Sequence, residues 1–192
     1  MTTESKQPKR KELAMYHKAA FAAFKYLLRK YKHNGDVELL DEHQLSKKSL
    51  QIDIIVVKKN PEITVEENWG KIFREYNIIE YKSPVDNYVS LDVFNKVIHG
   101  YTGIYASNTK ISLTQMTATI VCFKKPTALF EQLKSELNYK ILHKGNGIYY
   151  ISPKGSVESK SLLIQFVVSS ELEDSVVVLK ALHGKNGIGT SC

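Results

Sequence analysis

The chain has little cysteine and no long apolar run. Its 192 residues contain two cysteines, Cys122 in an apolar segment and Cys192 at the last position. Their spacing does not suit a metal site, and a reduced chain without a structural disulfide is expected. No apolar run approaches the roughly 20 residues that cross a bilayer, and residues 1–11 lack the apolar core of a secretory signal. These absences predict a cytoplasmic protein with no membrane partner.

Several catalytic signatures are also missing. The sequence contains no glycine-rich phosphate loop, no nucleophile elbow and no zinc motif. The histidines show no metal-ligand spacing and are interpreted as surface or core residues: His17, His33, His43, His99, His143 and His183. Any chemistry must therefore come from other side chains.

Basic residues outnumber acidic ones, 27 to 20, which gives a net charge of +7. Nucleic acid is a natural partner for such a chain, because lysine and arginine neutralise phosphates. Many soluble proteins are equally basic, so charge alone leaves the question open. The basic head, residues 1–11, is predicted to be a disordered, solvated tail.

Hydrophobic periodicity predicts one α/β domain over residues 12–182, followed by a tail at 183–192. The expected helices are 13–31, 91–105, 127–137 and 171–182, and the expected strands are 37–45, 50–57, 77–81, 115–123 and 162–168, with a hairpin over 139–151. Asn34 and Gly35 are expected to end the first helix. The first two strands are expected to form a hairpin through a turn at 46–49, and 63–75 to be a polar connection holding at most a short helical turn.

Three ionisable residues interrupt or end the apolar strands. Asp53 lies within the run 50–57, and Glu80 and Lys82 end the run that starts at Asn77. Burying such groups without partners costs several kcal/mol (roughly). Because alternate strand residues share a face, Glu80 and Lys82 point the same way. Two carboxylates and a lysine suit a divalent cation and an activated water.

A purely structural interpretation competes with this one. Glu80 and Lys82 can form an ion pair at a strand end, with Asp53 capping or pairing elsewhere. The tripeptide Glu-x-Lys also begins at Glu4 and Glu158, in polar segments. Only the copy at Glu80 follows an apolar strand and has an acidic strand upstream.

These residues resemble the PD-(D/E)XK nuclease superfamily, over about residues 13–123. Within it, the segments 50–59 and 72–84 with the following helix are similar to bacterial proteins near the recombination-promoting, transposase-associated nucleases. The resemblance implies a restriction-endonuclease-like core of order αβββαβ, with a central mixed β-sheet flanked by helices. Ile52 stands where the family name has proline, which supplies no ligand. The separation of Asp53 from Glu80 is long for the family, and an insertion after Asn60-Pro61 would explain it.

The resemblance also assigns roles. Asp53 and Glu80 match the two acidic metal ligands, and Lys82 matches the lysine that positions the attacking water. Glu42 matches an auxiliary acid of some branches. Independently of the resemblance, the coordination preference of Mg²⁺ makes the Tyr81 backbone carbonyl, between Glu80 and Lys82, the expected third protein ligand. The implied cofactor is Mg²⁺, with Mn²⁺ as a substitute, the implied substrate is DNA, and homodimers are common in the superfamily. The alternative function is a noncatalytic module that retains the fold and binds nucleic acid or protein. A third interpretation is a chain that binds neither metal nor nucleic acid.

Overall fold

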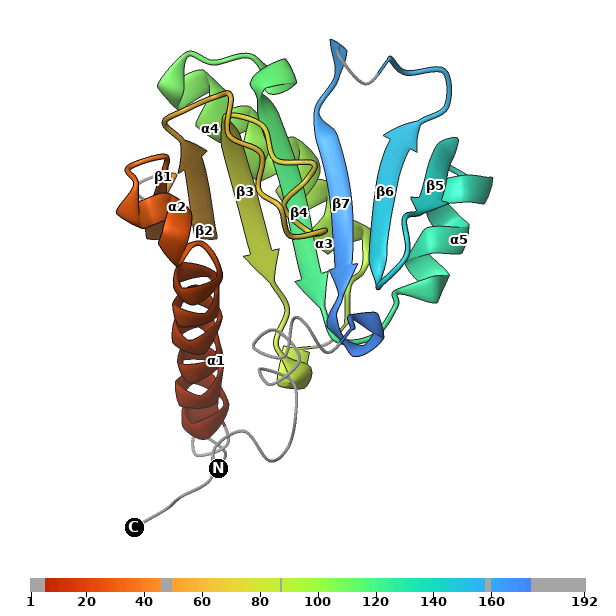
Figure 1. Cartoon of the computed structure of the whole chain (residues 1–192). Helices are drawn as coiled ribbons and strands as arrows, with labels where there is room; N and C mark the ends of the chain where they lie inside the picture. Colours follow the sequence, from red (N-terminus) through yellow and green to blue (C-terminus); the bar gives the residue numbers. More distant parts are fainter. Residues whose placement is uncertain (1–5, 46–49, 87, 158–159, 174–192) are drawn as a thin grey trace.

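The computed structural model describes residues 6–45, 50–86, 88–157 and 160–173. Within these ranges the strands form one mixed seven-stranded sheet of order β1-β2-β3-β4-β7-β6-β5 (Figure 1). The strands are β1 (Val37–Gln44), β2 (Gln51–Lys58), β3 (Tyr76–Tyr81), β4 (Met116–Cys122), β5 (Tyr139–His143), β6 (Ile148–Pro153) and β7 (Leu163–Val168). The predicted α/β class and the predicted strands are confirmed.

Pairing directions divide the sheet into two kinds of ladder. The strand β2 runs antiparallel to both β1 and β3, as the predicted hairpin requires. The centre is parallel, because β3, β4 and β7 run in one direction, and the β5–β6 hairpin joins β7 in antiparallel fashion. The carboxyl ends of β3, β4 and β7 therefore lie side by side along one edge of the sheet, the edge formed by the ends of the strands. The turn predicted at 46–49 lies outside the described residues.

Helices cover both faces of the sheet. The helical elements are α1 (Lys6–Leu27), α2 (Arg29–His33), η1 (Pro84–Asp86), α3 (Leu91–Asn95), η2 (Lys96–Tyr101), α4 (Thr102–Thr109), η3 (Leu113–Gln115), α5 (Thr127–Ser135) and η5 (Ser169–Glu171). One core lies between the sheet and α1 and contains Phe24 and Ile79. The other lies beneath α3, α4 and α5 and contains Phe94 and Phe130. Two covered faces explain why β3, β4 and β7 are buried along almost their whole length and are mostly apolar.

The first helix differs from its prediction at both ends. It begins at Lys6, so residues 6–11 are helical and the expected disordered tail is wrong there. Pro8 is compatible with this start, since the first turn of a helix has no internal partner for its N–H groups. The helix stops at Leu27 and a short second helix follows, with Leu28 at φ −93° and ψ 8° between them. Asn34 and Gly35, predicted to end the first helix, instead end this second helix, and Gly35 adopts φ +78°.

The segment between β2 and β3 is more than a polar connection. In Figure 1 its gold trace passes in front of β3 and β4. It forms turns rather than a regular helix and buries Val65, Trp69, Ile72 and Phe73. The Trp69 ring packs edge-on against Phe24 at 5.2 Å between centroids. This segment therefore completes the core on the α1 face.

The later helices also show deviations. The predicted helix 91–105 runs on to Thr109 and contains a π-helical segment, Lys96–Tyr101. The predicted helix 171–182 does not begin at Glu171, which ends a short 3₁₀ turn, and residues 174–182 lie outside the described residues. No helix in the described part of the chain is long and apolar enough to cross a bilayer.

Candidate active site

Asp53 sits where β2 and β3 separate. The paired positions of these strands end at Ile54 with Ile79, which are the chain neighbours of Asp53 and Glu80. Beyond that pair the Tyr81 N–H donates to Asp53 Oδ2 at 2.8 Å, so a side-chain oxygen replaces the next backbone acceptor of β2. An N–H and C=O of one strand residue point to the same side. The Tyr81 carbonyl is therefore directed toward the Asp53 strand.

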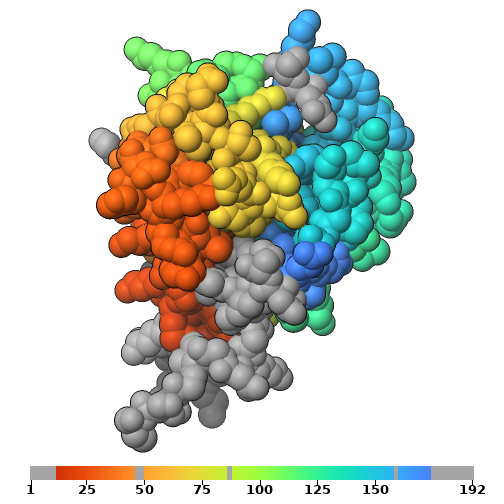
Figure 2. Space-filling view, viewed as in Figure 1, coloured from red at the N-terminus to blue at the C-terminus, as the bar shows by residue number. Residues whose placement is uncertain are grey.

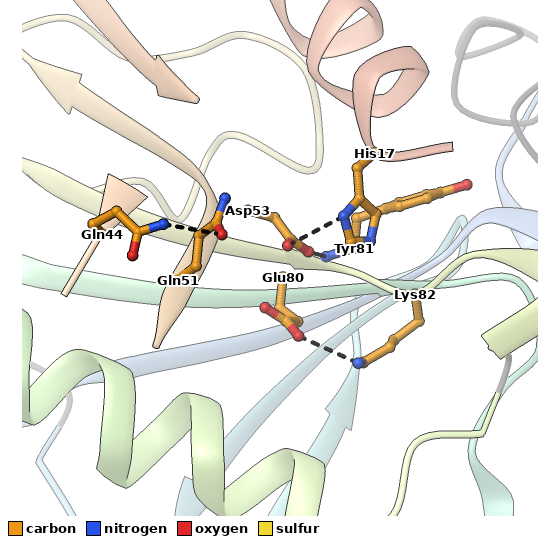
Figure 3. A network of polar contacts seen from close by, with 7 residues as sticks. All are labelled: His17, Gln44, Gln51, Asp53, Glu80, Tyr81 and Lys82. Carbon is orange, nitrogen blue, oxygen red and sulfur yellow. Dashed lines mark hydrogen bonds and ion pairs between the residues drawn. The ribbon is translucent and has the colours of Figure 1, made fainter. Parts of the chain in front are cut away.

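Glu80 and Lys82 project from the same face of β3, as the alternation predicts. Lys82 Nζ lies 3.2 Å from Glu80 Oε1 (Figure 3), and their side chains are 11% and 6% exposed, in that order. The second carboxylate oxygen, Glu80 Oε2, is buried and has no hydrogen-bond partner among the described residues. An unsatisfied buried acceptor of this kind is costly, by about 1–3 kcal/mol or more for a charged group. The ion pair with Lys82 therefore does not by itself satisfy the hydrogen-bonding capacity of the Glu80 carboxylate.

The two carboxylates are held in an environment that disfavours their charge. Burial raises the pKa of Asp53 from 3.8 to about 6, against the lowering effects of the Tyr81 N–H and of Lys82. Burial and the Asp53 charge raise the pKa of Glu80 from 4.5 to about 7, although Lys82 lowers it. Burial and like charge are the arrangements found at acid–base and metal sites.

The three predicted residues line one cavity of about 280 Å³. Six other residues share its lining: Leu13, His17, Glu42, Gln51, Lys96 and Tyr101. The predicted auxiliary acid Glu42 belongs to it. Glu42 lies in β1 between Asp41 and His43, which pair with Ile54 and Ile52 on either side of Asp53. Its backbone has φ +46°, and its charge is one of those that raise the pKa of Asp53.

Three lining residues were not among the predicted site residues, namely His17, Lys96 and Tyr101. His17 Nδ1 on α1 approaches Asp53 Oδ1 at 3.7 Å, as Figure 3 shows. This histidine gave no signal in the sequence, since its partner lies on another element. Its imidazole adds a further polar group to the same cavity.

The π-helical segment explains how Lys96 and Tyr101 reach the cavity together. In an α-helix, residues five apart are rotated by about 140° and face different directions. The i→i+5 winding of a π-helix places them one turn apart. Lys96 Nζ accordingly lies 4.8 Å from the Tyr101 ring centroid. Burial lowers the pKa of Lys96, but hydrogen bonding to Tyr101 and the Glu80 and Asp53 charges outweigh it, so the net shift is upward.

The donor set fits a weakly held hard cation. In the described part of the chain, no group of three or more His, Cys, Asp or Glu side chains is arranged to hold a metal ion. Magnesium does not require one, because it binds through one or two carboxylates and retains several waters. Asp53, Glu80 with its unpartnered Oε2, and the Tyr81 carbonyl are the groups that would hold it.

Comparison of this chain with protein-family models, curated proteins and solved structures finds no match.

Proposed function

We propose that this protein is a metal-dependent nuclease that hydrolyses phosphodiester bonds, with DNA as its substrate. The observation that carries the proposal is the convergence of Asp53, Glu80 and Lys82 in one cavity, with a carboxylate oxygen left unpartnered. Asp53 comes from β2, and Glu80 and Lys82 come from β3 and the residue after it. Buried acids and a lysine at one site suit phosphoryl chemistry better than a structural role.

The topology supports the restriction-endonuclease-like core. The helices α1 and α2 precede three antiparallel strands, a helical segment follows, and β4 then adds in parallel to β3. This is the order αβββαβ that the resemblance implies, with the first acid on the second strand. The strands β5 to β7 extend that core on the β4 side.

The residues of the cavity divide the chemistry among them. Asp53, Glu80 and the Tyr81 carbonyl would bind Mg²⁺ or Mn²⁺, which when bound polarises the phosphate and lowers the pKa of a bound water. Lys82 has ammonium N–H groups that hold and orient the attacking water. Attack forms one phosphorus–oxygen bond and breaks the bond to the leaving sugar oxygen, which gains a proton as the water loses one. Lys96 lines the same cavity and neutralises charge on the phosphate.

Cleavage assays test this proposal directly. Supercoiled plasmid and single-stranded, double-stranded and branched oligonucleotides are incubated with Mg²⁺, Mn²⁺ or EDTA. The variants are Asp53→Asn, Glu80→Gln and Lys82→Met, each close in shape to the original side chain. The controls are Glu131→Gln and Lys134→Met, which break an exposed ion pair on α5. Each site variant is expected to lose at least about 100-fold in rate, because even outer-shell partners of a metal cost 10–100-fold.

The outcomes separate the three interpretations. Metal-dependent cutting that is lost in the site variants and kept in the controls supports the nuclease. Equal cutting in all proteins indicates a contaminating enzyme. DNA binding that is indifferent to Mg²⁺ and to Glu80→Gln, without cutting, indicates the noncatalytic module. Absence of both binding and cutting leaves the Glu80–Lys82 pair as a structural ion pair.

A further inference from the structure

A second cavity lies at the same edge of the sheet as the candidate active site. It has a volume of about 200 Å³ and is lined by Tyr88, Val89, Lys124, Lys125 and residues 126–129 at the start of α5. Pockets that enclose a whole small molecule are larger, about 300–1,000 Å³. The cavity therefore suits one part of an extended ligand.

The register of β3 and β4 places this cavity near the active site. Tyr81 pairs with Val121, and the Lys82 N–H donates to the Val121 carbonyl at 2.8 Å. Lys82 is thus beside Cys122, and Lys124 follows two residues later. Adjacent strands are about 4.8 Å apart and two residues span at most about 7 Å, so the Lys82 and Lys124 backbones lie within about 12 Å of each other. Since a duplex strand advances about 3.4 Å per nucleotide, this separation corresponds to at most about four nucleotides along a strand.

Tyr88 presents an aromatic face to solvent at this place. Its side chain is 74% exposed, more than any other large hydrophobic residue in the described ranges. The neighbouring Val89 is 4% exposed and anchors the segment in the core beneath α3. Ser90 then caps α3 by accepting from the Val93 N–H. Tyr88 is therefore held outward by an anchored backbone.

The other lining groups favour an anion. Lys124 and Lys125 are exposed, and among the described residues no carboxylate lies within ion-pair distance of either. Lys125 Nζ is positioned 4.9 Å from the Tyr149 ring centroid. The amino-terminal end of α5 adds the positive end of a helix dipole. An exposed ring beside two ammonium groups offers the contacts that an unpaired nucleotide makes, base stacking and phosphate neutralisation.

We propose that the Tyr88–Lys124–Lys125 cavity holds an unpaired nucleotide of the substrate, a few nucleotides from the phosphate at Glu80 and Lys82. The proposal rests on the nuclease function and adds a preference for single-stranded or frayed DNA. Tyr88 stacks on the base, and Lys124 and Lys125 contact its phosphates. A fully paired duplex leaves the ring without a partner, because its bases are already stacked.

Binding measured without cleavage tests this inference. Fluorescence anisotropy in EDTA compares a labelled single-stranded 15-nucleotide oligonucleotide with its duplex, for wild type, Tyr88→Ala, Tyr88→Phe, Lys124→Ala and Tyr26→Ala. Tyr26 is the matched control, an exposed tyrosine on α1. Tyr88→Ala is expected to weaken single-strand binding by about 5- to 100-fold, with Tyr88→Phe and Tyr26→Ala near wild type. Lys124→Ala is expected to lower the salt dependence of binding by about one phosphate contact.

Failure of this inference is distinguishable from failure of the nuclease proposal. Single-strand binding by Tyr88→Ala within twofold of wild type, or an equal loss on the duplex, overturns the inference even if wild-type protein cuts DNA. Tyr88-dependent single-strand binding without any metal-dependent cutting supports the cavity and overturns the nuclease. Absence of oligonucleotide binding by the wild-type protein overturns the inference. Circular dichroism establishes that each variant is folded.

Discussion

Replacing Lys82 by methionine tests the electrostatics of the site in isolation from catalysis. Methionine keeps most of the buried stem and removes the ammonium that lies 3.2 Å from Glu80 Oε1. The Glu80 carboxylate then stays buried with no cation in contact, and its pKa, already raised to about 7 by burial and by Asp53, rises further. The free energy of unfolding should therefore fall, by an amount that depends on pH.

The pKa of Glu80 sets that amount. With a pKa of about 7, the ionised form is favoured over the protonated form by about 1 kcal/mol at pH 8. Removal of the Lys82 ammonium therefore lowers the free energy of unfolding by at most about this amount, because Glu80 takes up a proton when its buried charge would cost more. At pH 5 Glu80 is protonated in the folded wild type, so the variant should lose almost nothing. Because a raised folded-state pKa means that stability is lost as pH rises, the difference should grow further at pH 9.

Urea unfolding in EDTA at pH 5, 7, 8 and 9 measures the change in the free energy of unfolding. In thermal unfolding at pH 8, a loss of about 1 kcal/mol corresponds to a fall in Tm of roughly 2–4 °C for a chain of this length. The double variant Lys82→Met with Glu80→Gln should remove the part of the pH dependence that Glu80 contributes and leave the part that Asp53 contributes, since the Asp53 carboxylate remains. Lys134→Met, in the exposed pair on α5, should change stability by less than about 1 kcal/mol at every pH. An equal loss at pH 5 and pH 8 would refute the reasoning and assign Lys82 a packing role.

Three further outcomes are expected. In differential scanning fluorimetry, Mg²⁺ or Mn²⁺ should raise Tm more at pH 8 than at pH 5, because metal binds the deprotonated forms of Asp53 and Glu80. The Glu80→Gln variant should show no such increase. Lys96→Met should lower the rate of DNA cleavage by about 10- to 100-fold, as expected for a lost hydrogen bond to a charged group, whereas Lys110→Met, outside the cavity lining, should leave the rate unchanged. Gly147→Ala should lower the free energy of unfolding in urea more than Gly145→Ala does. Both glycines have positive φ, but only at Gly147 would a Cβ lie 2.4 Å from a backbone oxygen, that of Val168. Equal losses would mean that the loop moves away from Val168.

The fold was predictable wherever short-range pattern decides the structure. Apolar runs and turn residues locate the strands to within one or two residues, and Asn34-Gly35 ends the first helical region as expected. The predictions failed where packing overrides pattern. The segment before β3 carries charges and a proline, yet Trp69 and Phe73 are buried, because the sheet face beside α1 requires cover.

The candidate site was likewise predictable only where short-range pattern decides the structure. Two-residue periodicity alone puts Glu80 and Lys82 on one face of β3, and no other contact is needed to predict it. The sequence by itself therefore determined the strand residues that carry charge and the face they share. Only the tertiary structure decided that Asp53 meets the Tyr81 N–H, that His17 arrives from α1, and that π-helical winding turns Lys96 and Tyr101 inward. The physical reason is that side-chain alternation is a property of each strand, whereas the separation of β2 from β3 and the placement of helices over the sheet depend on burying both faces of the whole sheet at once.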